Sequence, residues 1–106
     1  MALVSMNTAK AYLRVDTSDE DMLIDSLLTS ATQLCYDVAR LDNETIEAVE
    51  ADATEDDSRE LAGIRSSLVV AILFTLGYLF EHREEADHVD LENTVRALLY
   101  AVREGR

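Results

Sequence analysis

The fold is decided by the stretch "VVAILFTLGYLFEHREEADH", residues 69–88. From Leu68 to Phe80 thirteen residues are almost all apolar, and at Glu81 the chain changes abruptly to charged and ionisable residues. Thirteen helical residues span roughly 20 Å, which is shorter than the hydrocarbon core of a bilayer, about 30 Å. We therefore expect a buried helix of a small bundle and not a membrane anchor.

The composition favours a helical fold. The chain has 106 residues, no proline and three glycines, and it is rich in alanine, leucine, glutamate and arginine. Few helix breakers and many helix formers indicate an all-α fold, and the length is that of one domain. We expect a single domain over residues 1–106, a small bundle of four to five helices with a long central helix.

The charge is strongly acidic. Nine lysines and arginines stand against 22 aspartates and glutamates, which gives a formal net charge of −13. This charge repels phosphate backbones and argues against tight nucleic-acid binding, although it is compatible with a protein that surrounds DNA without gripping it. The lone cysteine, Cys35, has no partner for an internal disulfide and fits a reducing compartment. The N-terminal residues lack the pattern of a signal peptide.

Two helices are expected before residue 41. The first is short, begins at a cap on Asn7 or Thr8 and ends near Arg14. The second begins at a cap on Thr17 or Ser18, followed by acidic residues that suit the positive end of the helix dipole. Its apolar stripe comprises Leu23, Leu27, Ala31, Leu34 and Val38, broadened by Ile24, Leu28, Cys35 and Ala39.

Residues 42–60 form an acidic connector. They contain nine acidic residues against one basic residue, Arg59. Ile46 and Val49 are able to dock a short helix, but little else in this stretch can be buried. We expect a solvated connector that is partly mobile or holds one short helix.

A long helix follows, from Asp57 or Ser58 to Glu85, and a last helix begins at a cap on Asp90. The middle of the long helix is apolar nearly all round, so we expect it to be central or covered by a partner chain. The two apolar stripes comprise Leu61, Ile64, Leu68, Ile72, Leu76 and Leu79 or Phe80 in the long helix, and Leu91, Val95, Leu98 and Val102 in the last helix.

No pattern predicts a catalytic or metal site. Glu85 and His88 have the Glu-x-x-His spacing of di-iron bundles, with His82 one turn away, but such sites need two of these motifs and two further glutamates. Cys35 lies on the apolar face of its helix, as an inert core residue does. No serine lies in a nucleophile motif. We expect no enzymatic activity, no catalytic residue, no metal and no cofactor.

Several arginines stand near aromatic or apolar residues in this acidic chain: Arg14, Arg83, Arg96 and Arg103. Such pairs are typical of protein interfaces, where guanidinium groups pair with carboxylates and stack on rings. The alternative is that these arginines form ordinary surface ion pairs of small energy. Oligomerisation would also cover the part of the long helix that the shorter helices leave bare.

Three segments carry a family resemblance: "AYLRVDTSDEDMLIDSLLTSA" (residues 11–31), "AILFTLGYLFEHREEADH" (71–88) and "LENTVRALLYAVREG" (91–105). In this order and spacing they resemble the small head–tail connector (adaptor) proteins of long-tailed bacteriophages and their prophages. The matching motifs are a YLR-(I/V)-D opening, a YL(Y/F)E(H/N)RE helix end and a (V/L)RALL…R last helix. The resemblance covers both ends of the chain and leaves out the acidic connector.

The resemblance implies an all-α protomer, without catalytic residues or cofactors, that assembles into a homo-oligomeric ring of about a dozen copies. Such a ring docks beneath the portal protein at the capsid vertex, extends the DNA channel and carries the tail or stopper proteins. The implied location is the head–tail junction of the virion, with assembly in the bacterial host cytoplasm. DNA would pass through without specific binding, in keeping with the negative charge.

Seven residues match these motifs as candidates for the subunit or portal interface. They are Tyr78, Glu81, Arg83, Glu84, Arg96, Leu99 and Arg103. The opening motif is matched by four residues that we expect to fix the first turn against the core: Tyr12, Leu13, Arg14 and Asp16. The same charge also fits a second hypothesis, a free-standing acidic helical module that masks a basic partner.

Overall fold

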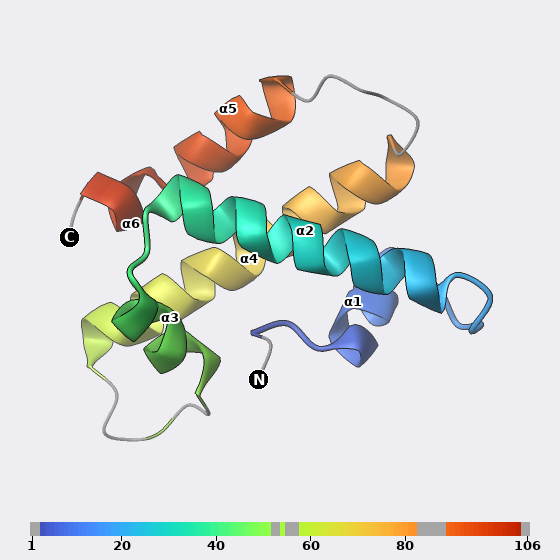
Figure 1. Ribbon diagram of the computed structural model, residues 1–106, viewed down its shortest axis with the longest axis horizontal. Helices are drawn as coiled ribbons and strands as arrows, with labels where there is room; N and C mark the ends of the chain where they lie inside the picture. Colours follow the sequence, from blue (N-terminus) through green and yellow to red (C-terminus); the bar gives the residue numbers. More distant parts are fainter. Residues whose placement is uncertain (1–2, 52–53, 55–57, 83–88, 105–106) are drawn as a thin grey trace.

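The computed structural model describes residues 3–51, 54, 58–82 and 89–104. Within these residues the fold is all-α, as the sequence predicts, with six helices and no strand (Figure 1). The helices are α1 (Met6–Leu13), α2 (Asp21–Ala39), α3 (Asn43–Glu50), α4 (Arg59–Glu81), α5 (Val89–Leu98) and α6 (Tyr100–Glu104). The predicted long central helix is α4.

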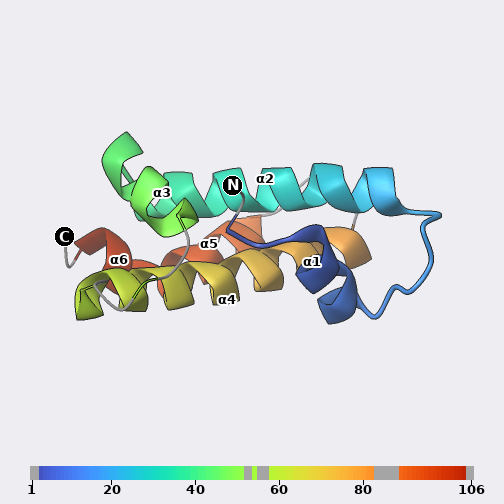
Figure 2. The same cartoon turned by 90° about the horizontal axis from the view of Figure 1, so that it is seen from below.

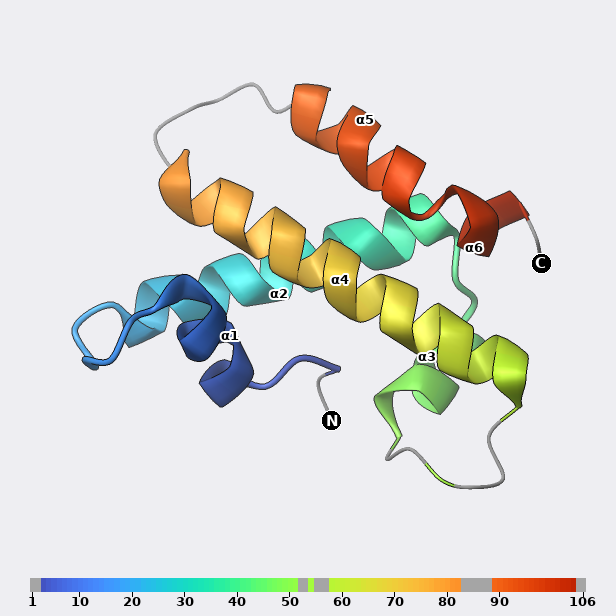
Figure 3. The same ribbon diagram turned by 180° about the vertical axis from the view of Figure 1, so that it is seen from behind.

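Helices α2 and α4 cross in two stacked layers and form the centre of the bundle (Figure 2). Helix α1 packs against both of them, and so does α5 on the other side of α4 (Figure 3). Helix α3 packs on α4, and α6 packs on α2. One cluster of buried side chains joins all six helices, so the shorter helices share a single core with α2 and α4.

The central helix begins where the sequence predicts. The Ser58 hydroxyl caps α4 by accepting a hydrogen bond from the backbone N–H of Leu61 at 3.0 Å. Three residues of the expected stripe are fully buried: Leu68, Ile72 and Leu76. The helix ends at Glu81, and the expected continuation to Glu85 lies outside the described residues.

Among the described helices, α4 alone is long and apolar enough to cross a membrane, judged by length and composition. The length of the 13-residue apolar run alone therefore does not exclude a membrane span, because the helix that contains this run has 23 residues. Here α4 packs against α1, α2, α3 and α5 and occupies the centre of the core. This is the position that the sequence predicts for it.

Helix α1 has a different cap from the predicted one. The Ser5 hydroxyl accepts a hydrogen bond from the backbone N–H of Thr8 at 3.1 Å, so Ser5 is the cap rather than Asn7 or Thr8. The expected end is confirmed, because Leu13 is the last helical residue and Arg14 is the C-cap.

The start of α2 also differs from the prediction. Its N-cap is Glu20, without a side-chain cap bond, and not Thr17 or Ser18. The Lys10 ammonium of α1 lies 2.7 Å from the Asp21 carboxylate in the first turn of α2. This partly exposed ion pair ties the two helices together with a small energy.

The buried face of α2 is rotated relative to the expected stripe. Its centre is formed by Ile24, Leu28, Ala31, Cys35, Tyr36 and Ala39, most of which the spacing places at the margin. The outer residues of the expected stripe are half-buried: Leu23, Leu27, Leu34 and Val38. Both the expected and the observed buried face have helical spacing. Packing on α4 decides which of the two is buried.

The acidic connector contains an ordered helix, so the short-helix alternative is confirmed for α3. Its N-cap is Asp42, and Val49 is fully buried. Arg65 of α4 donates hydrogen bonds to the carbonyls of Val49 at 3.2 Å, Ala48 at 3.0 Å and Ala51 at 3.2 Å. These carbonyls lie at the C-terminal end of α3, where a cation is favourable. Arg65 therefore holds α3 against the central helix.

The predicted last helix is divided, and its inward face is shifted. Helix α5 ends at Leu98 and α6 begins at Tyr100. Leu99 is fully buried, whereas Leu98 is 41% exposed, so the prediction that Leu98 faces inward is wrong. Asp90 lies in the first turn of α5 and not at its cap. The inward positions are Leu91, Val95, Leu99 and Val102.

Candidate functional site

The predicted interface residues that the structure places at the surface fall into two groups. Tyr78 and Glu81 line a hollow formed by α4 and the end of α1. Arg96 and Arg103 line a second hollow at the C-terminal end of α2. The two hollows share no residue, so they are separate surfaces.

The other three predicted interface residues are in neither hollow. Leu99 packs in the core with no exposed area, which removes it from the interface. Arg83 and Glu84 lie outside the described residues.

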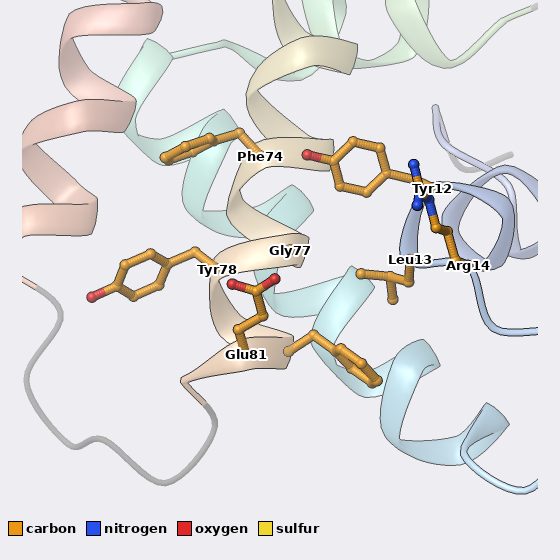
Figure 4. A pocket seen from close by; sticks show the side chains of 8 residues that line it. Tyr12, Leu13, Arg14, Phe74, Gly77, Tyr78 and Glu81 are labelled. Atoms are coloured by element: carbon orange, nitrogen blue, oxygen red, sulfur yellow. The ribbon is translucent and has the colours of Figure 1, made fainter.

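The first surface, which we call the aromatic groove, has a volume of about 460 Å³ (Figure 4). Its lining is largely aromatic and apolar with one charge of each sign: Tyr12, Leu13, Arg14, Phe74, Gly77, Tyr78, Phe80 and Glu81. Tyr12 reaches toward α4 from α1, while Phe74 and Tyr78 project from α4 on the opposite side (Figure 4). Tyr12 is 49% exposed and Phe74 is 37% exposed. Aromatic rings therefore face solvent at this surface.

Gly77 makes room for the ring of Tyr12. A β-carbon on Gly77 would stand 3.1 Å from Cε2 of Tyr12 and 3.6 Å from its hydroxyl oxygen. The first distance is tighter than ordinary van der Waals contact, so a larger residue would displace the tyrosine. Gly63 in the same helix has no neighbour within 4 Å of such a β-carbon. Only Gly77 is therefore required by packing.

The last turn of α4 fixes the orientation of Tyr78. The rings of Tyr78 and His82 lie 4.2 Å apart between centroids, with an interplanar angle of 56°. The His82 backbone N–H also donates to the carbonyl of Tyr78 at 2.9 Å. This wall of the groove is therefore held in place at the point where the sequence changes from apolar to charged.

The second surface, which we call the arginine pocket, has a volume of about 270 Å³. It joins the end of α2 to α5 and α6, and its lining consists of Leu34, Asp37, Val38, Arg40, Glu92, Arg96 and Arg103. The Nε atom of Arg103 is buried and has no hydrogen-bond partner among the described residues. The Asp37 carboxylate already accepts a hydrogen bond from the Gln33 amide at 2.9 Å.

Each surface includes an arginine with a left-handed backbone. Arg14 has a φ of 59° at the end of α1, and Arg40 has a φ of 56° at the end of α2. Glycine is the usual residue at such C-terminal positions, because a β-carbon is strained there. An arginine in this conformation favours a role for its side chain on the surface that it lines.

The opening motif contributes to the groove more than the sequence predicts. Leu13 packs half-buried against the core as expected. Tyr12 and Arg14 instead line the aromatic groove, and Asp16 is exposed. The signal that points to this arrangement is Gly77, a glycine within the apolar run of the long helix, which often marks a close approach.

Cys35 is a core residue, as the sequence predicts. Its side chain is fully buried, and Sγ lies 3.6 Å from the Thr75 hydroxyl oxygen. Burial raises the pKa of this thiol to about 11, partly offset by the hydrogen bond with Thr75. The thiol is therefore protonated near neutral pH and is a poor nucleophile.

The residue pattern of a metal site is not found in the described part of the chain. No group of three or more His, Cys, Asp or Glu side chains there is arranged to hold an ion. Glu85 and His88 of the Glu-x-x-His motif lie outside the described residues.

The two surfaces, one aromatic and one rich in arginine, have the chemistry of protein contacts. No protein-family model, curated protein or solved structure matches this chain.

Proposed function

We propose that this protein is a structural subunit of a ring at the head–tail junction of a long-tailed bacteriophage or prophage. The ring sits beneath the portal protein, extends the DNA channel and carries the tail or stopper proteins. The three sequence motifs that resemble head–tail connector proteins support the choice of system. The protein acts as an assembly component and not as an enzyme.

The observation that carries the proposal is the exposed apolar side of α4. Val70 is 59% exposed and Phe74 is 37% exposed, although both belong to the helix at the centre of the core. Phe74 continues into the aromatic groove, where Tyr12 also faces solvent. Exposed apolar side chains one turn apart on a helix, as Val70 and Phe74 are, favour a site of contact with another protein.

A ring needs two different contact patches on each subunit, because its subunits meet head to tail. The aromatic groove and the arginine pocket are separate surfaces of different chemistry, so one subunit offers more than one kind of contact patch. The formal net charge of −13 supports the same function, since an acidic ring repels the DNA phosphates and lets the duplex slide through.

A pair of substitutions tests this proposal. Phe74→Ser removes a ring from the apolar side of α4, so we expect assembly alone or on portal rings to weaken by at least about tenfold, equal to 1.4 kcal/mol. Met22→Ser is the matched control, because Met22 is 88% exposed on α2 and lies in neither surface. Analytical ultracentrifugation measures both. Equal assembly of the two variants would show that this side of α4 is not a contact surface.

A further inference from the structure

The arginine pocket and an acidic turn lie at opposite ends of the molecule. The turn between α1 and α2 carries Asp16 and Asp19, both exposed. The pocket lies at the other end of α2, whose 19 residues separate the two by about 28 Å. In Figure 1 the turn lies at one end of the long axis, and α6 lies at the other end.

The pocket concentrates positive charge in an acidic chain. Three of the arginines that the structure describes line it: Arg40, Arg96 and Arg103. Within the described residues, no ion pair joins Arg96 or Arg103 to a carboxylate. Asp37 and Glu92 line the same pocket, so its lining has an excess of one positive charge. The buried Nε donor of Arg103 also lacks an acceptor within the described chain.

We propose that the arginine pocket binds the acidic turn, residues 16–20, of a second copy of this chain. The guanidinium groups of Arg96 and Arg103 pair with the carboxylates of Asp16 and Asp19 from the neighbour. The contact joins two different patches, so it is heterologous and runs head to tail. Closure of these contacts into a ring rests on the proposed function, whereas the pairwise contact does not.

Charge and position favour this occupant over others. Asp37 and Glu92 also line the pocket, so an occupant needs hydrogen-bond donors beside its carboxylates. The turn offers the hydroxyls of Thr17 and Ser18, whereas a fully ionised phosphate offers no donor.

The exposed acids of α3, Glu44 and Glu47, follow closely after Arg40 at the same end of the molecule. The acids of α3 are thus neighbours of the pocket on the same subunit. The acidic turn lies at the opposite end and is a separate patch, as a heterologous contact requires.

A spin-label experiment on the full chain tests the contact directly. Ser18→Cys provides an attachment site for a nitroxide on the exposed acidic turn, in copies that contain no ¹⁵N. Cys35 is fully buried and stays unmodified. These copies are mixed at high concentration with ¹⁵N-labelled wild-type protein. We expect broadening of the side-chain Nε–H signals of Arg96 and Arg103, and none for Arg59. Broadening should disappear at about 1 M salt, where the screening length falls to about 3 Å.

Absence of broadening at Arg96 and Arg103, or broadening that is equal at Arg59, would overturn the proposal. Native mass spectrometry of the same samples reports ring formation separately. Broadening without rings, both in these samples and after addition of portal rings, would keep the contact and reject the proposed function. Rings without broadening at the arginine pocket would keep the proposed function and reject this contact.

A charge exchange provides a second test that does not depend on the label. Arg96→Glu reverses the pocket at an exposed residue, and the double variant Asp16→Lys with Asp19→Lys reverses the exposed turn. We expect each variant alone to associate at least about tenfold more weakly than wild type, by the loss of charge-assisted pairing. An equal mixture of the two should recover association, because each reversed patch then meets its complement. Wild-type association of each variant alone, or no recovery in the mixture, would contradict the proposal. Circular dichroism confirms that both variants are folded.

Discussion

The ring of Tyr12 on α1 lies so close to Gly77 on α4 that a β-carbon at residue 77 would stand 3.1 Å from the tyrosine Cε2. Glycine in a helix interior is usually unfavourable, because it costs about 1 kcal/mol relative to alanine. At this position its absence of a side chain sets the depth of the aromatic groove. Gly77 and Tyr12 therefore link the packing of two helices to the shape of a contact surface.

Gly77→Ala separates stability from assembly. We expect the free energy of unfolding to stay equal or rise by up to about 1 kcal/mol, because alanine favours the helix and the half-exposed Tyr12 can move aside. Assembly should weaken, since the displaced ring changes the groove. Denaturant titration measures the first effect and ultracentrifugation the second.

Gly63→Ala is the control for this prediction. Apart from its chain neighbours and the backbone of its own helix, nothing lies within 4 Å of a β-carbon at residue 63. This variant therefore gains the same helix propensity without touching the groove. If both alanine variants assemble like wild type, the groove is not a contact surface.

Arg65 is expected to hold α3 in place. Arg65→Ala removes donors to three carbonyls at the end of α3, and we expect a loss of about 1–3 kcal/mol in the free energy of unfolding. Backbone amides of α3 should exchange with solvent much faster than in wild type. Arg59→Ala is the control, because Arg59 is exposed in the first turn of the same helix. Unchanged exchange in α3 after loss of Arg65 would contradict this role.

Stability should fall in alkaline solution. Burial raises the pKa of Cys35 from 9.0 to about 11. Burial also raises the pKa of Tyr36, and the hydrogen bond that its hydroxyl donates to Glu50 at 2.8 Å raises it further. The folded state thus holds both protons more tightly than the unfolded chain. This stabilisation is complete below the unfolded pKa values and is lost as the pH rises through the folded ones.

We therefore expect the free energy of unfolding to decline between about pH 9 and pH 11, on the order of 2 kcal/mol for Cys35. Cys35→Ala and Tyr36→Phe should each make the decline shallower. Denaturant titrations at a series of pH values measure it. A wild-type stability that does not change over this range would show that neither group is protonated preferentially in the fold.

Arg40 combines a strained backbone with a place in the arginine pocket. Arg40→Gly should raise the free energy of unfolding by about 1 kcal/mol, because glycine adopts a positive φ without steric cost. Arg40→Ala keeps the strain and loses only the side chain, so it should be no more stable than wild type. Thermal unfolding compares the two. Equal stability of the glycine and alanine variants would mean that the left-handed conformation is not strained.

The helices follow from local patterns, but the phase of their faces does not. Apolar spacing and the Ser58 cap are local features, and they predict α4 and its buried residues well. In the last helix, steps of three and four residues lead from Val95 to either Leu98 or Leu99, and both are helical spacings. Packing of the folded chain buries Leu99 and leaves Leu98 partly exposed. Local periodicity alone does not distinguish the two.

Long-range contacts explain what the sequence could not predict about the site. In the sequence, Arg65 is a charged residue just before an apolar run. Its hydrogen bonds to the end of α3 form only because α3 packs against α4 in the folded chain. The motifs single out Tyr78 and Arg96 together as interface candidates. Their placement on two separate surfaces is a property of the folded chain.

The most direct test of the central claim is native mass spectrometry of the full chain at rising concentration, alone and with rings of a bacteriophage portal protein. The proposed function predicts a closed oligomer of about a dozen copies, formed alone or on the portal ring. A chain that remains monomeric in both conditions would contradict it. Binding of that monomer to a basic protein would favour the acidic masking module instead.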